Sequence, residues 1–262
     1  MGSATTQAFA AAHQQLRAVG AIDLTTAQQV FEAGRVIGDA PALLAALTAF
    51  ESDAAPKIAL VSELFGSSLN PAALSLLQGL VASRWSSSHD LLAGIEYLGI
   101  RLAAASPGAA QIDEELFAFS RVVASDHELE LALGSKLSPV DAKVAVATQL
   151  LVNAHPATRL IVTHLLRQPR GRRIGEMLRH AGELAADQNG FLVATVQSAQ
   201  PLDAAAAKRL QQSLQARYDR DVRLDVVVEP AVLGGLKVQI GDDVIDGTIA
   251  ARLGELRLKL VG

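Results

Sequence analysis

The C-terminal stretch Leu233–Leu260, LGGLKVQIGDDVIDGTIAARLGELRLKL, decides the interpretation, because its glycines and aspartates could form either a ligand-binding loop or a set of turns. A phosphate-binding loop needs glycines that lead directly into a helix, usually with a Lys and a Ser or Thr. The nearest Lys, Lys237, instead lies inside the alternating run LKVQI, which predicts a strand. A calcium loop needs a twelve-residue pattern of oxygen ligands that ends in Glu, and Asp242, Asp243 and Asp246 do not provide it. A structural role is therefore favoured over a ligand site.

The same stretch has the turn residues of a small sheet. Gly234 and Gly235 stand between two alternating runs and predict a bend or bulge. Gly241, followed by an Asp, fits a tight hairpin turn. The sequence Asp246-Gly247-Thr248 predicts the cap of a final helix. The apolar stripe of that helix would comprise Ile249, Leu253, Leu256 and Leu260.

Upstream of this stretch, residues 190–262 continue the pattern of a small α+β domain. FLVATVQSA predicts a first strand, and PLDAAAAKRLQQSLQARY predicts a helix that is capped by Asp203. VRLDVVVE alternates strictly and predicts a further strand. The residues that would point to one side are Val222, Leu224, Val226 and Val228. The predicted order is strand, helix, strand, strand, short strand and helix.

The first 189 residues predict helices only. In NPAALSLLQGLVA, Asn70 is the predicted N-cap and Pro71 the first helical residue, ahead of an apolar stripe at helical spacing. SPVDAKVAVATQLLV repeats this arrangement with Ser138 as N-cap and Pro139 at the first helical position, and its stripe would begin at Val140. The fold class is thus a multidomain α+β protein, with helical bundles followed by the small α+β domain.

The helical region contains a weak internal repeat. Phe31 matches Phe117 and Lys57 matches Lys143 at the same offset, and Pro71 matches Pro156 at an offset one residue smaller. We interpret this as a tandem duplication, although amphipathic, Ala-rich helices can also resemble one another by chance. The predicted domains are a helical bundle at 1–105, a second at 106–189 and the α+β domain at 190–262.

Composition excludes several classes of function. The chain has 262 residues with a net charge of −4, so a general attraction to nucleic acid or anionic lipid is not expected. It has no Cys, which excludes disulfides, thiolate nucleophiles and sulfur-ligated zinc. The first twenty residues lack the apolar core of a signal peptide, and no apolar run is long enough to span a bilayer. We expect a soluble, intracellular protein.

Catalytic or metal-binding constellations are weak. Ser88, His89 and Asp90 have the residue types of a hydrolase triad, but as sequence neighbours they cannot form its relay, so a solvated loop is favoured. His127 and Glu128 are an isolated pair of possible metal ligands beside the start of a helix. No catalytic residue, cofactor or metal ligand is predicted.

The most conspicuous charge feature is the run RQPRGRRIGEMLRH, which has five arginines against one acidic residue. The three interpretations are a nucleic-acid contact, a solvated corner between two helices, and a contact with acidic residues of a neighbouring subunit. No aromatic residue is interleaved and the whole chain is acidic, which disfavours nucleic acid. The arginines concerned are Arg167, Arg170, Arg172, Arg173 and Arg179.

The C-terminal stretch resembles the signature of the δ subunit of bacterial F-type ATP synthases, the family of the mitochondrial oligomycin-sensitivity-conferring protein. That signature has a Gly-Gly before a strand, a Gly-Asp turn, and an apolar-Asp-Gly-Ser/Thr before a Leu-rich helix. ELALGSKLSP, RGRRIGEMLRHAGELA and VQSAQPLD also resemble family segments, so that the likeness covers about 110–262. Residues 1–105 exceed the family's usual length and look like an extra helical bundle. The matching positions are Gly234, Gly235, Gly241, Asp242, Ile245, Asp246, Gly247 and Thr248.

The resemblance implies a non-catalytic stator subunit of the peripheral stalk. Its helical domain would receive the amphipathic N-terminal helices of the α subunits in grooves, and its C-terminal domain would bind the C-terminal region of subunit b. It would be held at the cytoplasmic face of the bacterial cell membrane only through the complex, and would resist rotor torque. The sequence does not decide which of the two helical bundles binds the α subunits. The alternatives are a helical scaffold or adaptor unrelated to ATP synthase and a nucleic-acid-binding module that uses the arginine run; an enzyme is the weakest.

Overall fold

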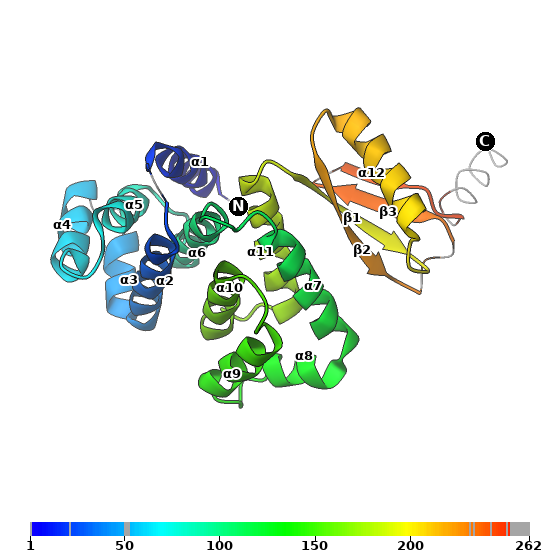
Figure 1. The fold of residues 1–262 in the computed structure, drawn as a ribbon. Coiled ribbons are helices and arrows are strands. Elements are labelled where there is room, and N and C mark those ends of the chain that lie inside the picture. Colours follow the sequence, from blue (N-terminus) through cyan, green and yellow to red (C-terminus); the bar gives the residue numbers. More distant parts are fainter. Residues whose placement is uncertain are drawn as a thin grey trace, which may run out of the picture. The chain divides into compact units, whose positions relative to one another are not determined.

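The computed structural model describes residues 2–20, 22–49, 53–230, 232, 234–241, 243–249 and 251. The chain divides into two compact units, 1–185 and 186–262. Figure 1 shows the helices of the first unit and the sheet of the second.

The first unit is built from helices alone. They are α1 (Ser3–Ala18), α2 (Leu24–Asp39), α3 (Pro41–Thr48), α4 (Ala54–Phe65), α5 (Pro71–Ala82), α6 (Ser88–Ala104), α7 (Ile112–Ser125), α8 (His127–Gly134), α9 (Val140–Leu150), α10 (Pro156–Arg167) and α11 (Ile174–Gln188), the last of which crosses the limit of the unit. No helix in the described part of the chain is long and apolar enough to cross a membrane.

Local capping explains where several helices begin. Asn70 caps α5 as predicted, because its side chain accepts a hydrogen bond of 2.8 Å from the Ala73 amide. Ser87 caps α6, so Ser88, His89 and Asp90 form the first turn of a helix, and the prediction of a solvated loop was wrong. The second predicted cap was wrong by one residue: α9 begins at Val140, and Pro139 stands at the N-cap without a side-chain hydrogen bond.

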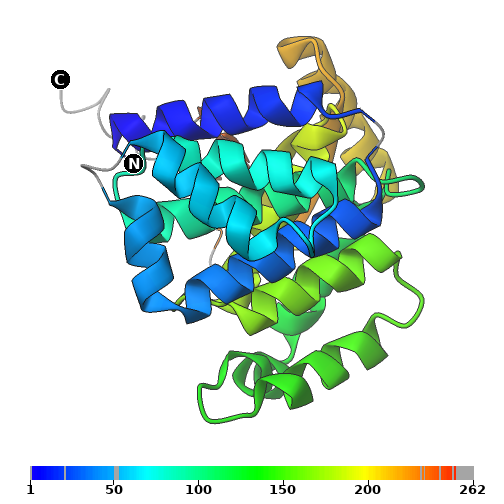
Figure 2. The same cartoon turned by 90° about the vertical axis from the view of Figure 1, so that its left-hand side faces the viewer.

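The first helix set, α2–α6, packs around the α2–α6 contact. Phe31 on α2 is 1% exposed and lies against Gly99 on α6, where a Cβ atom would overlap the ring. Helix α3 packs against both α2 and α6, α4 packs against α5, and α1 covers α5 and α6. In Figures 1 and 2, α1 lies at the opposite end of the helical unit from α8 and α9.

The second helix set, α7–α11, repeats this order of helices. Phe117 on α7 lies against Gly182 on α11, as Phe31 lies against Gly99. Helix α10 also packs against α2 and α6 of the first set, so that one hydrophobic core includes residues from both sets. The predicted limit between 105 and 106 therefore falls inside one compact unit.

The second unit is a four-stranded sheet with one described helix, α12 (Ala204–Tyr218). The strands are β1 (Leu192–Ser198), β2 (Val222–Val228), β3 (Leu236–Ile240) and β4 (Asp243–Asp246), in the order β2-β1-β3-β4. Strand β1 pairs with β2 in parallel and with β3 antiparallel, and β3 and β4 form an antiparallel hairpin. The predicted strands, the Asp203 cap and the α+β character of this domain are confirmed.

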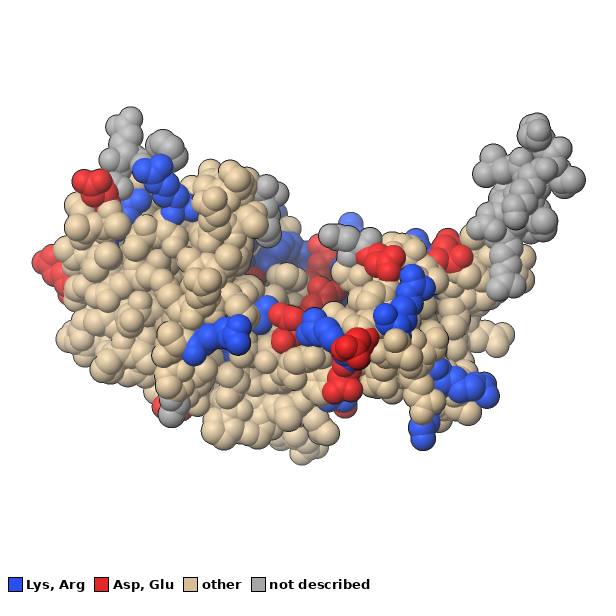
Figure 3. Space-filling view, turned by 90° about the horizontal axis from the view of Figure 1, so that it is seen from above, with Lys and Arg blue, Asp and Glu red and all other residues tan. Residues whose placement is uncertain are grey.

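The burial of side chains along β2 does not follow its alternation to the end of the strand. Val222 is buried, but Val228 is 46% exposed, while Asp225 on the opposite face is only 4% exposed. The predicted stripe of the final helix falls mostly outside the described residues, because Leu253, Leu256 and Leu260 are among those not described. Figure 3 shows that charged side chains are scattered, with broad uncharged areas, over the visible face of the helical unit.

Candidate functional site

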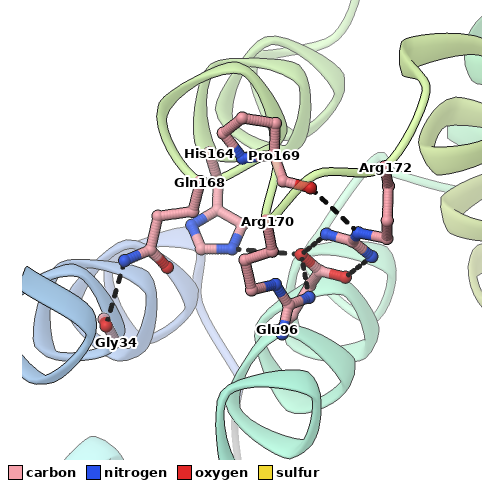
Figure 4. Close-up of polar contacts among 7 residues, drawn as sticks. All are labelled: Gly34, Glu96, His164, Gln168, Pro169, Arg170 and Arg172. Carbon is pink, nitrogen blue, oxygen red and sulfur yellow. Dashed lines mark hydrogen bonds and ion pairs between the residues drawn. The ribbon is translucent and has the colours of Figure 1, made fainter. Parts of the chain in front are cut away.

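A buried carboxylate joins the two helix sets (Figure 4). Glu96 lies on α6 of the first set, and its side chain is 5% exposed. Arg172 donates to it from both terminal guanidinium nitrogens, Nη1 at 2.6 Å from Oε1 and Nη2 at 2.7 Å from Oε2. Arg170 Nη2 lies 2.7 Å from Oε2. Both arginines come from the loop that connects α10 to α11, so Glu96 ties that loop to α6.

The loop at 168–173 is fixed by further hydrogen bonds. Gln168 Nε2 donates to the Gly34 carbonyl on α2 over 3.2 Å, and Arg172 Nε donates to the Pro169 carbonyl over 3.3 Å. Arg170 has a positive φ of 49°, a conformation that non-glycine residues adopt at a free-energy cost. The ion pair with Glu96 helps to hold the backbone in this conformation.

His164 completes the cluster from the inner face of α10. Its Nε2 lies 3.6 Å from Glu96 Oε2, and its ring stacks on Phe31 with the ring centroids 4.1 Å apart. Burial lowers the pKa of His164 and outweighs the opposing effect of Glu96, so that the neutral imidazole is favoured. This histidine acts as a packing residue between the two sets.

The positive groups around Glu96 offset the effect of burial on its carboxyl group. Burial alone would raise the pKa of the Glu96 carboxyl, but the adjacent His164 ring, the hydrogen bonds from Arg172 and the positive charges of Arg170 and Arg172 hold that pKa well below its ordinary value. The carboxylate is therefore ionised at neutral pH. Two arginines with one carboxylate leave a net positive charge on the loop.

A groove of about 810 Å³ is bordered by this loop. We call it the α8–α9 groove, because its walls are α8, the turn after α8, the start of α9, the 168–173 loop and the first turns of α11. Arg172 lines the groove and also binds Glu96, so that the ionic cluster positions one wall. Its buried apolar residues are Leu133, Leu166, Ile174 and Met177.

The five arginines of the run lie in three kinds of environment. Arg170 and Arg172 form internal ion pairs with Glu96, so they do not act as two free cations of a surface patch. Arg167 pairs with Asp141 at 2.8 Å and Arg179 with Glu183 at 3.5 Å, both near the surface. Arg173 is exposed and lines the groove.

Glu96 was missed by the sequence interpretation. The available signal was a single acidic residue inside the apolar helix LLAGIEYLGIRLAA, because a charge in such a position needs a partner. The partner could not be read from spacing, since Arg172 lies far along the chain and only packing of α10 on α6 brings it near.

The glycines of the C-terminal signature have structural roles. Gly234 and Gly235 have φ of 67° and 81°, and a Cβ at Gly235 would overlap the Gly247 carbonyl, so the backbones of the two segments approach closely. Gly241 has φ of 57° at the β3–β4 turn. Its neighbour Asp242 lies outside the described residues.

Asp246 and Thr248 form successive caps at the end of the sheet. Asp246 Oδ1 accepts a hydrogen bond from the Thr248 amide over 3.0 Å, and Thr248 Oγ1 accepts one from the Ala251 amide over 3.2 Å. The hydrogen bonds lower the pKa of Asp246. Within the described residues, no group of three or more His, Asp or Glu side chains could hold a metal ion.

Comparisons with known proteins point to one family. The family described as "ATP synthase delta (OSCP) subunit" matches residues 100–260. A protein of Leifsonia xyli subsp. xyli called "ATP synthase subunit delta" is 46% identical over 265 residues, covering 100% of both chains. A Streptomyces griseus subsp. griseus protein with the same name is 36% identical over 271 residues, again covering 100% of both.

Chains of solved structures also match, and one of them matches weakly. It is a chain of the structure titled "Cryo-EM structure of Toxoplasma gondii mitochondrial ATP synthase hexamer, composite model". The TM-score is 0.43 at 21% identity, covering 64% of this chain and 96% of that one.

Proposed function

This chain belongs to the ATP synthase delta (OSCP) subunit family, and we propose that it links the catalytic head to subunit b of the peripheral stalk. Subunits of this family are structural and non-catalytic parts of ATP synthase. The observation that carries the proposal is the match to bacterial δ subunits from end to end, at up to 46% identity.

In the proposed arrangement, the helical unit receives the N-terminal helices of the α subunits and the α+β unit binds the C-terminal region of subunit b. Helix-in-groove binding requires apolar grooves between helices, and the helical unit offers one. The chain would then lie at the cytoplasmic face of the bacterial membrane, held there by the complex. It would resist the torque of the rotor.

The test is a pair of titrations with the full chain. The chain is titrated into the isolated catalytic head of the same organism and, separately, into the soluble part of subunit b. We expect binding to both, and loss of head binding when the N-terminal segments of the α subunits are removed. If the folded chain binds neither, the proposal fails and a helical adaptor of another assembly becomes the better description.

We also propose that the two helix sets arose by duplication, with domains at 1–105, 106–189 and 190–262. The two sets match in helix order, and the short helices α3 and α8 both have 8 residues. Pro71 and Pro156 both start 12-residue helices. The matched lysines Lys57 and Lys143 are both buried, at 7% and 8% exposure. An unrelated pair of bundles has no reason to share all of these features.

The nucleic-acid alternative is disfavoured by the ion pairs of the arginine run. Glu96 neutralises part of the charge of Arg170 and Arg172 and holds both side chains against α6. A phosphate backbone would have to compete with a buried carboxylate for these two arginines.

A further inference from the structure

The α8–α9 groove has an apolar base and an apolar rim. Leu131 on α8 is 58% exposed and Val140 at the start of α9 is 39% exposed, and both line the groove. Leu137, in the turn between them, is 95% exposed. Large apolar side chains that surround a groove are typical of a surface that another protein covers.

The rim also carries uncompensated positive charge. Lys136 and Arg173 line the groove and are exposed, and Lys143 lines it at 8% exposure. None of the three takes part in an ion pair within the described residues. The Lys143 ammonium donates to the Ser135 carbonyl, a neutral acceptor, although a buried cation is best compensated by an anion. Glu130 is the acidic side chain among the lining residues.

The combination of shape and charge selects the kind of partner. A small anion would use the cations but leave Leu131 and Val140 in water. A purely apolar helix would cover those two residues but leave Lys143 without a counter-charge. An amphipathic helix with Asp or Glu beside its apolar face satisfies both sets of groups.

We propose that the α8–α9 groove docks an amphipathic helix with acidic residues along the margin of its apolar face, carried by another subunit of the ATP synthase. The carboxylates of that helix pair with Lys136, Arg173 and Lys143, while its apolar side chains cover Leu131 and Val140. This inference rests on the proposed function, because that function supplies the partner subunits.

The partner can be identified with a single reactive position. The chain has no Cys, so Leu131→Cys creates one thiol at the groove, to which a photoreactive maleimide is attached. Val36→Cys is the matched control, because Val36 on α2 is 52% exposed. The labelled chains are assembled with the catalytic head and soluble subunit b, irradiated and digested for mass spectrometry. We expect position 131 to crosslink one helical segment rich in Asp or Glu that position 36 does not reach.

The charges are tested by binding. The double variant Lys136→Glu/Arg173→Glu and the single variant Leu131→Asp are each compared with Arg17→Glu/Arg84→Glu, which makes the same charge change at two exposed residues of the helical unit that do not line the groove. We expect each groove variant to weaken binding of the crosslinked partner at least tenfold, and the control to stay within twofold. The wild-type affinity for that partner should fall as salt rises, and that of the double charge variant should fall less.

The outcomes separate the two proposals. If the wild-type chain binds the head and subunit b but the groove variants bind both equally well, the groove inference is wrong and the proposed function stands. A crosslink at position 131 to a segment without acidic residues also overturns the inference. If the wild-type chain binds neither partner, both proposals fall.

Discussion

The two helix sets use the same order of helices but fill the space around them differently. In the first set, α3 packs directly against α6, and α1 covers α5 and α6. At the matching place in the second set, between α8 and the start of α11, lies the α8–α9 groove. A second difference concerns the helix that covers α5. In the first set α1 covers it, whereas α10, the counterpart of α5 in the second set, packs against α2 and α6 of the first set. The first set is thus closed by its own helices together with α1. The second set is closed by the first set on one side and is left open at the α8–α9 groove.

This difference teaches that a repeated helix order can serve two purposes within one compact unit. The first set supplies a closed scaffold, and the second set uses that scaffold as a packing surface. The Glu96 cluster is the polar contact at which the two sets meet, because the carboxylate comes from one set and both arginines from the other.

The largest effect should come from breaking this contact. Glu96→Ala leaves Arg170 and Arg172 without their buried counter-charge, and loss of one partner of a buried pair typically costs about 3–5 kcal/mol of the free energy of unfolding. Urea unfolding followed by the fluorescence of Trp85, the one tryptophan of the chain, measures this in the helical unit. The control Glu183→Ala removes an exposed pair with Arg179 and should cost below about 1 kcal/mol. Equal effects of the two variants would contradict a special role for Glu96.

Acid should loosen the same contact reversibly. The pKa of Glu96 is lower in the folded chain than its ordinary value of 4.5, so the unfolded state binds the proton more readily. The stabilisation is therefore complete above about pH 4.5 and is lost as the pH falls below it. Unfolding free energies of the wild type and of Glu96→Gln, measured between pH 6 and pH 3, should differ less at the acid end. Parallel pH profiles would show that Glu96 contributes no pH dependence.

A smaller effect should distinguish the two Phe–Gly contacts. A Cβ at Gly99 would overlap the ring of Phe31, which is also stacked on His164 and has no room to move. Gly99→Ala should therefore cost about 1–3 kcal/mol through overpacking. At Gly182 the Cβ would lie 2.7 Å from the Phe117 ring, farther than a Cβ at Gly99 would lie from the Phe31 ring, so the overlap is smaller. The helix-forming tendency of Ala, about 1 kcal/mol, favours both substitutions equally, because both glycines lie inside helices. Thermal denaturation measures the loss of stability in both variants. A greater loss in Gly182→Ala than in Gly99→Ala would contradict this prediction.

The smallest effect should separate the two matched helix caps. Asn70 accepts from the Ala73 amide and donates to Thr26 Oγ1, so Asn70→Ala should cost about 1–2 kcal/mol. His155 Nδ1 accepts from the Ala157 amide at 3.2 Å, a longer contact, and His155→Ala should cost less. Hydrogen exchange of the amides in the first turns of α5 and α10 reports each cap directly. A greater loss of protection in α10 would reverse the expected order.

Much of the fold could be predicted because it depends on local patterns. The Asn70 and Asp203 caps and the alternation in β3 are determined by residues close in sequence. The alternation does not give the exposure of Val228, because exposure at a strand end depends on what covers it. The position of α9 moved by one residue, since Pro139 fits a non-helical N-cap as well as a first helical turn.

The candidate site was harder to predict because it depends on distant contacts. The arginine run was visible as a cluster of charge, but its division into ion-paired and groove-lining residues required the position of α6. The apolar residues of the groove could not be separated from core residues in the sequence. Leu133 is 3% exposed and Leu131 is 58% exposed, yet both belong to the same short helix.

The order of strands in the second unit has a mechanical consequence. The chain leaves α11 through a turn at Gly190 and enters the sheet on β1, which is hydrogen-bonded to β2 on one side and to β3 on the other. Tension that travels along the chain from the helical unit therefore pulls on an inner strand in the direction of its length. Such a pull loads the hydrogen bonds on both sides of β1 together, in shear, instead of peeling them apart one after another. For the proposed role in the peripheral stalk, this point of entry would add resistance to rotor torque.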